Sequence, residues 1–433
     1  MRPTLPARRL NFSSSHDLTL STSQALTVSI FSCLSEGAAE ICRLLKEECP
    51  VRDGLLTPLQ IRDLTLVNRS VVSAMCLYSA GTNGVARTFH EAHLTRFALG
   101  GAGLIFTEAT AISAEGRITP ADLGIYTDKQ AGRLGEIAGK IKELGSVPGI
   151  QISHAGRKGS GIAPWAAPGD YAGIDGFPWN IKAPSAIAAP GKATPEALTA
   201  SEIDMLLQDW ITAARRADAA GFEVLELHGA HGYLLHQFLS PLTNQRTDNW
   251  GGSLENRMRF PLEVVRAVRA AWPAGKPLFY RMSVGDGDNA HWSLADSVTF
   301  ARRLKVLGVD VVDCSGGGIE DVTTRRPPGT HGYQVPWAAK LKHDTGVRTM
   351  AVGLITEAQQ ADSIIAQGQA DLVAVARQNL VNPNWTALAR HQLTGGYDGF
   401  PPQFASFLAR WSDVVSALPP VADTAAHLRQ LKE

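Results

Sequence analysis

The chain has 433 residues, and its 41 basic side chains balance 41 acidic ones, so its formal net charge is zero. This balance excludes the basic field that a nucleic-acid partner requires, and no apolar stretch approaches the length that spans a bilayer. The five cysteines are odd in number, irregularly spaced and not clustered, which argues against both a disulfide framework and an iron–sulfur centre.

Residues 1–34 differ in composition from the rest of the chain. They contain several arginines, many serines and threonines and a single acid, Asp17. This composition is typical of an organelle transit peptide, and the alternative is a disordered extension without a targeting role. Helical spacing of apolar residues over 35–49 then predicts a short helix ahead of the folded domain.

From about Leu56 onward, short apolar runs alternate with amphipathic segments. Eight runs have the composition of buried strands: Ser70–Met75, Gly103–Glu108, Gly149–His154, Glu223–His228, Leu278–Ser283, Val309–Cys314, Arg348–Val352 and Asp371–Val375. Five segments show clear helical periodicity: Asp128–Leu144, Glu202–Ala220, Leu254–Ala271, Leu294–Leu307 and Glu357–Gln367. Helix-stopping glycines precede four of the strands: Gly145, Gly221, Gly308 and Gly368.

Strands that alternate with helices predict an α/β protein with a parallel sheet, and eight such units predict a closed (β/α)8 barrel of the TIM type. We therefore divide the chain into an N-terminal extension over 1–50, a barrel over 51–395 and a C-terminal tail over 396–433. The role of the tail is not evident from its pattern.

The two longest connections, residues 155–198 and 229–253, both follow strands, so we expect them on the carboxyl face, where barrels bind ligands. His228, His231 and Tyr233 lie at the start of the second connection. They would place three hydrogen-bond or proton donors around one small pocket, and the alternative is two capping histidines with a structural tyrosine. No nearby acid or cysteine completes a metal ligand set.

Arg281 lies inside an apolar strand, where a guanidinium is costly to bury without an anionic partner. That partner is either a carboxylate of the barrel, such as Glu108 or Glu226, or a bound electron-rich ligand. Cys76 and Tyr78, just after the first strand, are ordinary residues by themselves.

The loops after the seventh and eighth strands predict a phosphate site. Gly353 lets a ligand approach the backbone, Thr356–Gln359 fits a capping box at the start of a helix, and Arg377 supplies a positive fork. Gly100–Gly103 follows a helix and precedes a strand, which is the wrong order for a Rossmann turn. The polar segment Asn244–Ser253 is expected to brace the active-site loop through side-chain hydrogen bonds.

Taken together, these motifs strongly resemble the old yellow enzyme family, and the cysteine after the first strand resembles its thermophilic-type branch. The likeness covers roughly residues 55–395 and rests on six ordered motifs: Ala74–Tyr78, Gln151–Arg157, His228–Pro241, Asn244–Arg257, Gly332–Pro336 and Ala351–Thr356. The resemblance implies an FMN-containing barrel that uses NADPH or NADH to reduce enones and enals, with no metal.

The resemblance also implies a position for the cofactor. The family's FMN contacts correspond to nine residues: Ala74, Met75, Cys76 and Ala109 against the ring, Gln151 and Arg281 at its pyrimidine edge, and Gly353, Ala376 and Arg377 at the phosphate. In such a site Arg281 would stabilise the reduced, anionic flavin, and Cys76 would tune its reduction potential rather than act as a nucleophile.

The substrate contacts follow from the same resemblance. His228 and His231 would bind the carbonyl oxygen of an enone, so that its β-carbon accepts hydride from flavin N5. Tyr233 would deliver a proton to the α-carbon, and Tyr78 would add a hydrogen bond or a wall. One pocket would serve both half-reactions, so ping-pong kinetics are expected.

The chain departs from the family pattern at several positions. Ala74 stands where proline is frequent, and Ala376 stands where glycine is usual. Thermophilic-type members extend a C-terminal arginine into a neighbouring subunit's site; here Ser406 occupies the expected position, and Arg410 comes later. A homodimer or homotetramer is expected, without an assigned shared site.

Three rival interpretations remain open at this level. The first is another flavin barrel, such as a dienoyl-CoA-type reductase that lacks iron–sulfur cysteines. The second is a non-catalytic flavin-binding barrel, and the third, more remote, is a metal-dependent hydrolase. The expected location is the cytoplasm or, if the leader is a targeting segment, a plastid or mitochondrion.

Overall fold

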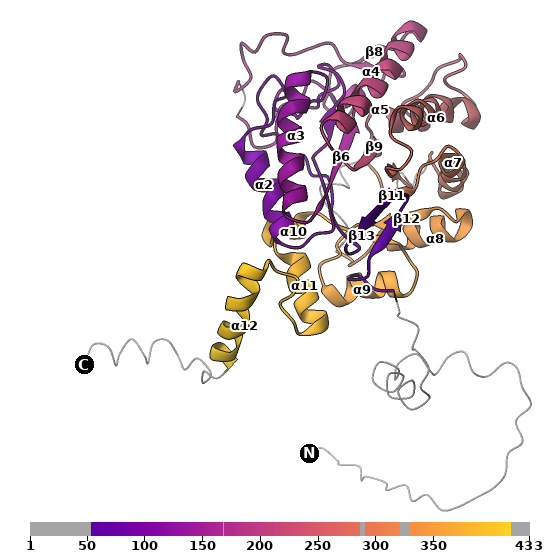
Figure 1. Cartoon of the computed structure of the whole chain (residues 1–433). Helices are drawn as coiled ribbons and strands as arrows, with labels where there is room; N and C mark the ends of the chain where they lie inside the picture. Colours follow the sequence, from indigo (N-terminus) through magenta and orange to yellow (C-terminus); the bar gives the residue numbers. More distant parts are fainter. Residues whose placement is uncertain (1–52, 168, 286–290, 321–328, 417–433) are drawn as a thin grey trace, which may run out of the picture. The chain divides into compact units, whose positions relative to one another are not determined.

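The computed structural model describes residues 53–167, 169–285, 291–320 and 329–416 (Figure 1). The helix predicted over 35–49 and the predicted targeting segment lie outside these residues. No helix in the described ranges is long and apolar enough to cross a membrane.

Eight parallel strands form the centre of the fold. They are β3 (Ser70–Val72), β4 (Leu104–Phe106), β6 (Val147–Ser153), β9 (Val224–Gly229), β10 (Leu278–Ser283), β11 (Val311–Ser315), β12 (Arg348–Ala351) and β13 (Leu372–Val375). Each pairs in parallel with its neighbours, and pairing of β4 with β6 closes the ring. A short strand, β5 (Thr110–Ala111), lies beside β6. The predicted (β/α)8 barrel is therefore confirmed.

Helices alternate with the strands and surround them (Figure 1). They are α2 (Thr88–Leu99), α3 (Asp128–Glu143), α4 (Ala200–Ala219), α6 (Leu254–Ala271), α7 (Leu294–Val306), α8 (Val335–Thr345), α9 (Ala358–Ala366), α10 (Arg377–Val381) and α11 (Trp385–Thr394). Sequence periodicity located five of them within two residues at each end. It did not locate the other four, α2, α8, α10 and α11. In α2 and α8, polar and apolar residues are mixed around the helix instead of segregated on two faces.

The predicted helix stops are confirmed by backbone conformation. Gly221 after α4 and Gly308 after α7 have φ angles of 83° and 91°, in the left-handed region that residues with a Cβ rarely adopt. Gly100 and Gly101 likewise follow α2 and precede β4, so the rejection of a Rossmann turn there is also confirmed.

The capping box predicted at Thr356 is wrong. Helix α9 begins at Ala358, and its N-cap residue, Glu357, makes no side-chain cap hydrogen bond. The Thr356 hydroxyl lies 3.3 Å from Nδ1 of His331, and the Thr356 amide donates to Oε1 of Gln360. The helix therefore starts one residue later than the sequence pattern indicates, because a tertiary contact engages the threonine.

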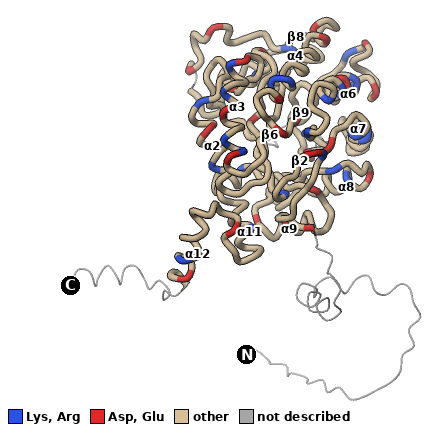
Figure 2. The backbone as a smooth tube through the Cα atoms, in the orientation of Figure 1, with Lys and Arg blue, Asp and Glu red and all other residues tan. Residues whose placement is uncertain are grey.

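Two apolar clusters hold the barrel together. One fills its interior with side chains from alternate strand positions, including Val71, Phe279 and Met350. The hairpin β1 (Leu59–Ile61) and β2 (Leu64–Leu66) adds Ile61 and Leu66 to this interior cluster. The other, larger cluster packs the helices against the outside of the strands. Charged residues of both signs are interspersed along the described chain (Figure 2).

Candidate active site at the carboxyl face of the barrel

The His228–Tyr233 segment forms a compact group of rings at the carboxyl end of β9. The ring of His228 lies 5.2 Å from that of His231 and 4.9 Å from that of Tyr233, each in an edge-to-face arrangement. His231 has a φ angle of 58°, a left-handed conformation that is strained for a residue other than glycine. The fold thus assembles the three side chains that the sequence placed at one pocket.

Both histidines are neutral. Burial, and next the positive charge of Arg281, holds the pKa of His228 and of His231 well below the ordinary range. Nδ1 of His228 accepts from the Ala230 amide at 3.4 Å, so in the neutral ring Nε2 carries the proton. His228 can therefore donate one hydrogen bond from Nε2 without carrying a charge.

His231 is held by residues from two neighbouring strands. Its amide donates to the Ser283 hydroxyl at 2.9 Å, and its Nε2 lies 2.7 Å from Oγ of Ser315. Its carbonyl accepts from Nζ of Lys158 at 2.7 Å, and that ammonium also lies 5.7 Å from the centre of the Tyr233 ring. The sequence analysis did not identify these serines and this lysine. Each stands at or near a strand end of the carboxyl face, and a polar residue in that position was the signal that could have revealed it.

Arg281 has a partner that the sequence analysis did not name. Its Nε lies 3.1 Å from Oδ2 of Asp313, on the adjacent strand, so the barrel carboxylate that pairs with it is neither of the two examples given above, Glu108 and Glu226. The two groups attract through charge but are poorly aligned for a hydrogen bond, and neither Asp313 oxygen has a hydrogen-bond donor among the described residues. An isolated acid inside the apolar run Val311–Ser315 was the signal that could have revealed it.

A second buried carboxyl lies beside this ion pair. Oε1 of Glu226 accepts from the Gln151 amide at 2.8 Å, and both side chains are buried. Burial, and next the charge of Asp313, raises the pKa of Glu226 to about 8, so this group is largely protonated at neutral pH. Gln151 and Arg281 are therefore both anchored by acids beneath the barrel mouth.

A cavity of about 260 Å³ opens between the ends of β11, β12 and β13. Its lining includes Arg281, Arg377, His231, Ser315, Tyr333 and Gly353. Gly353 has a φ angle of 112°, and a Cβ there would come within about 3 Å of the Tyr333 and Gln334 side chains. Ala376 also lines the cavity, directly before Arg377. The predicted phosphate residues and the predicted pyrimidine-edge arginine thus face one cavity.

The loop after β3 is fixed by a buried carboxylate. Glu108 accepts from the amides of Leu77 and Tyr78 through Oε2, and its Oε1 lies 2.9 Å from Nε2 of His90. From the loop over 155–198, Nε1 of Trp165 donates to the Leu77 carbonyl at 3.1 Å. Glu108 therefore holds backbone rather than Arg281, and Tyr78 keeps a left-handed φ of 53°.

The remaining predicted ring contacts lie on this loop and beside it. Ala74, Met75 and Cys76 are only partly buried, and the Ala109 amide hydrogen-bonds to Cys76. Burial, and next the charge of Glu108, raises the pKa of the Cys76 thiol well above its usual value. A neutral thiol is a poor nucleophile, which agrees with the expectation that Cys76 does not attack substrate.

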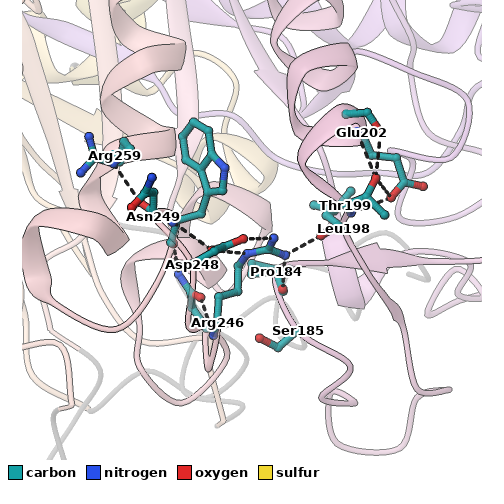
Figure 3. Close-up of polar contacts among 12 residues, drawn as sticks. Pro184, Ser185, Leu198, Thr199, Glu202, Arg246, Asp248, Asn249 and Arg259 are labelled. Atoms are coloured by element: carbon teal, nitrogen blue, oxygen red, sulfur yellow. Dashed lines mark hydrogen bonds and ion pairs between the residues drawn. The ribbon is translucent and has the colours of Figure 1, made fainter.

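The segment Asn244–Ser253 braces its surroundings as predicted. Nη1 of Arg246 donates to the carbonyls of Pro184 and Leu198, and its other nitrogens pair with Asp248 (Figure 3). The Asn244 amide group donates to the carbonyls at 238 and 250. These bonds tie the loop after β9 to the long loop after β6, so the two walls of the carboxyl face are held together.

These residues fit a flavin mononucleotide on chemical grounds. Guanidinium groups of Arg281 and Arg377 face one cavity, where they suit an electron-rich ring edge and a phosphate, and Gly353 leaves room for close backbone approach. Asp313 and Nε of Arg281 also lack well-aligned hydrogen bonds. The fold and this site define a barrel oxidoreductase that binds a phosphorylated redox cofactor.

Comparison with known proteins gives the family. Residues 54–395 match the NADH:flavin oxidoreductase / NADH oxidase family, and the chain belongs to it. An NADPH dehydrogenase of Geobacillus sp. (strain WCH70) is 43% identical over 341 residues, which cover 78% of this chain and 94% of that protein. The NADPH dehydrogenase of Bacillus subtilis (strain 168) is 42% identical over 341 residues, with 78% and 95% covered.

Solved structures agree with this family. Morphinone reductase superposes with a TM-score of 0.66 at 27% identity, covering 79% of this chain and 90% of that one. The old yellow enzyme homologue from Zymomonas mobilis gives a TM-score of 0.64 at 25% identity, with 79% and 92% covered. The chain is thus a flavin-dependent oxidoreductase of the old yellow enzyme type.

Proposed function

We propose that this protein is an FMN-dependent NADPH dehydrogenase that reduces the C=C bond of α,β-unsaturated carbonyl compounds. The observation that carries the proposal is the pair of neutral imidazoles, His228 and His231, packed against Tyr233 at the rim of a cavity that also contains Arg281. The NADPH dehydrogenase names of relatives at 42–43% identity support NADPH as the reductant.

The cofactor contacts are proposed residue by residue. Ala74, Met75, Cys76 and Ala109 face the ring, Gln151 and Arg281 its pyrimidine edge, and Gly353, Ala376 and Arg377 the phosphate. The lining of the cavity by Arg281, Gly353, Ala376 and Arg377 supports the second and third of these assignments, and the hydrogen bond between Ala109 and Cys76 supports the first. When bound, FMN supplies hydride transfer between the nicotinamide and the alkene. Arg281, with Asp313 at 3.1 Å, offers a fixed positive charge in a buried setting.

The two imidazoles hold the substrate carbonyl. His228 donates from Nε2, and His231 donates from Nδ1 when Ser315 donates to its Nε2. Both rings are neutral and buried, so the hydrogen bonds that their N–H groups donate become stronger as negative charge develops on the carbonyl oxygen. These hydrogen bonds make the alkene more electrophilic.

Tyr233 is the proposed acid that protonates the α-carbon, and Tyr78 completes the substrate wall. Lys158 lies over the Tyr233 ring, and this nearby positive charge favours the phenolate that remains after proton transfer. Tyr78 lies near enough for its pKa to respond to Tyr233, although burial is the main reason that its pKa is raised.

The direct test is anaerobic turnover of cyclohexenone by the purified, FMN-loaded protein with NADPH. Ene-reduction to cyclohexanone is expected, and a yellow protein without turnover would instead favour a non-catalytic flavin barrel. A His228→Ala, His231→Ala double variant should keep FMN and lose phenol binding, which is read from the flavin charge-transfer band. Retained phenol affinity in that variant would remove the carbonyl-binding role.

We also propose that two copies of the chain associate through α12 (Pro402–Ser416). Its apolar residues Phe404, Phe407, Trp411 and Val414 repeat every three or four positions and are all exposed. A second copy would cover this stripe. Light scattering should show a dimer, and Phe407→Glu with Trp411→Glu should yield a monomer.

The division into an extension (1–50), a barrel (51–395) and a tail (396–433) is proposed as well, and the family match over 54–395 supports it. The role of residues 1–34 as a targeting segment remains a prediction. N-terminal sequencing of the protein purified from its own cells tests it, since a cleaved transit peptide would shift the first residue to near the start of the barrel.

A further inference from the structure

A second cavity lies apart from the proposed active site. Its volume is about 480 Å³, and its walls come from the loop after β5, the residue that follows β6, β7 (Lys182–Ala183) and the first half of α4. None of its lining residues borders the cavity that contains Arg281. The proposed function therefore leaves this space unexplained.

The charge of this cavity is not balanced by its own residues. Lys182 is paired with Glu196 and Glu202, at 2.5 and 2.8 Å; Figure 3 shows Glu202 beside Leu198 at the start of α4. The side chains of Glu115 and Asp209 make no hydrogen bond or ion pair with the described part of the chain. Two carboxylates thus face the cavity without a cationic partner in the part of the chain that the structure describes.

Glu115 lies close enough to Asp209 for its charge to affect the pKa of Asp209. Burial, and next the negative charge of Glu115, raises the pKa of Asp209 to about 6. At pH 7.5 the group is ionised all the same, so the cavity has a negative potential that a bound cation would relieve.

His154 provides an independent sign of a ligand. Only 2% of the residue is exposed, and its ring lines the cavity. Its Nδ1 accepts from the Gly156 amide at 3.0 Å, so the neutral ring carries its proton on Nε2. Burial lowers the pKa of His154 to about 4, which keeps it neutral. Nε2 has no hydrogen-bond partner among the residues that the structure describes, and it is not one of the fully buried unpartnered atoms, so this donor is available to a ligand in the cavity.

Apolar groups complete the cavity. Leu198 and Leu206 are buried beneath it, and Met205 lies at its edge with 60% of its surface exposed. Aliphatic side chains of this kind stabilise a short hydrocarbon chain by removing it from water. The cavity therefore combines acceptors for a cation, one neutral N–H donor and an apolar wall.

We propose that this cavity binds an aliphatic amino alcohol, or a ligand of the same chemistry: an ammonium with a neighbouring oxygen acceptor on a short apolar chain. The ammonium pairs with Glu115 and Asp209, the oxygen accepts from Nε2 of His154, and the chain packs on Leu206 and Met205. The proposal does not depend on the chemistry at the flavin.

The experiment is calorimetric titration of the full-length, FMN-loaded protein with leucinol at pH 7.5. We expect saturable binding of one equivalent. 4-Methylpentan-1-ol, which lacks the ammonium, should bind about tenfold more weakly or worse, and 3-methylbutylamine, which lacks the hydroxyl, should fall between them. Gln208→Lys places a competing ammonium on the exposed cavity wall and should weaken leucinol about tenfold without disturbing a buried group.

Asp204→Asn is the matched control, since it removes an exposed carboxylate of α4 that does not line the cavity. Its leucinol affinity should equal that of the wild type. Equal binding of leucinol and 4-methylpentan-1-ol, absence of binding, or full affinity in the Gln208→Lys variant would each overturn the proposal. So would displacement of phenol from the flavin by leucinol, because that result would place the amine in the active site.

Discussion

Ser315 is the residue whose removal tests the proposed carbonyl site most sharply. Its hydroxyl lies 2.7 Å from Nε2 of His231, and it stands at the carboxyl end of β11. Ser315→Ala should leave the fold intact, because the side chain ends a strand and loses only one atom. It should, however, remove the hydrogen bond that fixes the orientation and the tautomer of the His231 ring.

The magnitude follows from the bond that is lost. A hydrogen bond between neutral groups contributes about 0.5–1.5 kcal/mol net, which corresponds to a roughly two- to tenfold weaker phenol affinity. Titration of the FMN-loaded variant with phenol, followed by the charge-transfer absorbance, measures it. FMN content should not change, since the serine acts on His231.

Ser240→Ala is the control, because it removes a buried hydroxyl that has no hydrogen-bond partner among the described residues. Its phenol affinity should match the wild type, and Ser315→Thr, which keeps a hydroxyl, should recover part of the loss. Wild-type phenol affinity in Ser315→Ala would refute the reasoning that this serine orients His231.

Three further predictions concern other groups. Tyr233→Phe should slow reoxidation of the reduced enzyme by cyclohexenone about tenfold or more, but leave reduction by NADPH nearly unchanged; stopped-flow measurement of both halves decides, and equal slowing would contradict an acid role. The pKa of Glu226 is raised to about 8, so its contribution to stability is lost as pH rises from about 4.5 to 8, because the unfolded chain releases that proton first. Glu226→Gln should therefore reduce the fall in unfolding free energy over this window by up to about 1.4 kcal/mol per pH unit. An unchanged slope would count against this assignment. Arg246→Ala should lower the unfolding free energy by on the order of 1–3 kcal/mol, because its contacts with backbone carbonyls and with Asp248 are lost. Urea denaturation measures this loss, and the exposed Arg266→Ala is the control. Similar losses in both variants would argue against the bracing role.

Much of the fold was predictable because its signals are local. Strand length, helical periodicity and the glycines that end helices are set by backbone sterics and by the burial of one face, so the eight strands were located from short windows alone. The motif around His228 could be recognised for the same reason, since its histidines and tyrosine are close in sequence. The missed α2 and α8 lack that segregation of polar and apolar residues.

Only the tertiary structure decided which distant residues meet. Parallel pairing aligns Arg281 with His228 on one side and with Asp313 on the other, and the same alignment brings Ser283 and Ser315 to His231. The acidic cavity beside His154 likewise draws on segments dozens of residues apart. Local propensity determines which elements form, but strand register and barrel closure determine which strand ends converge, and those depend on contacts across the whole chain.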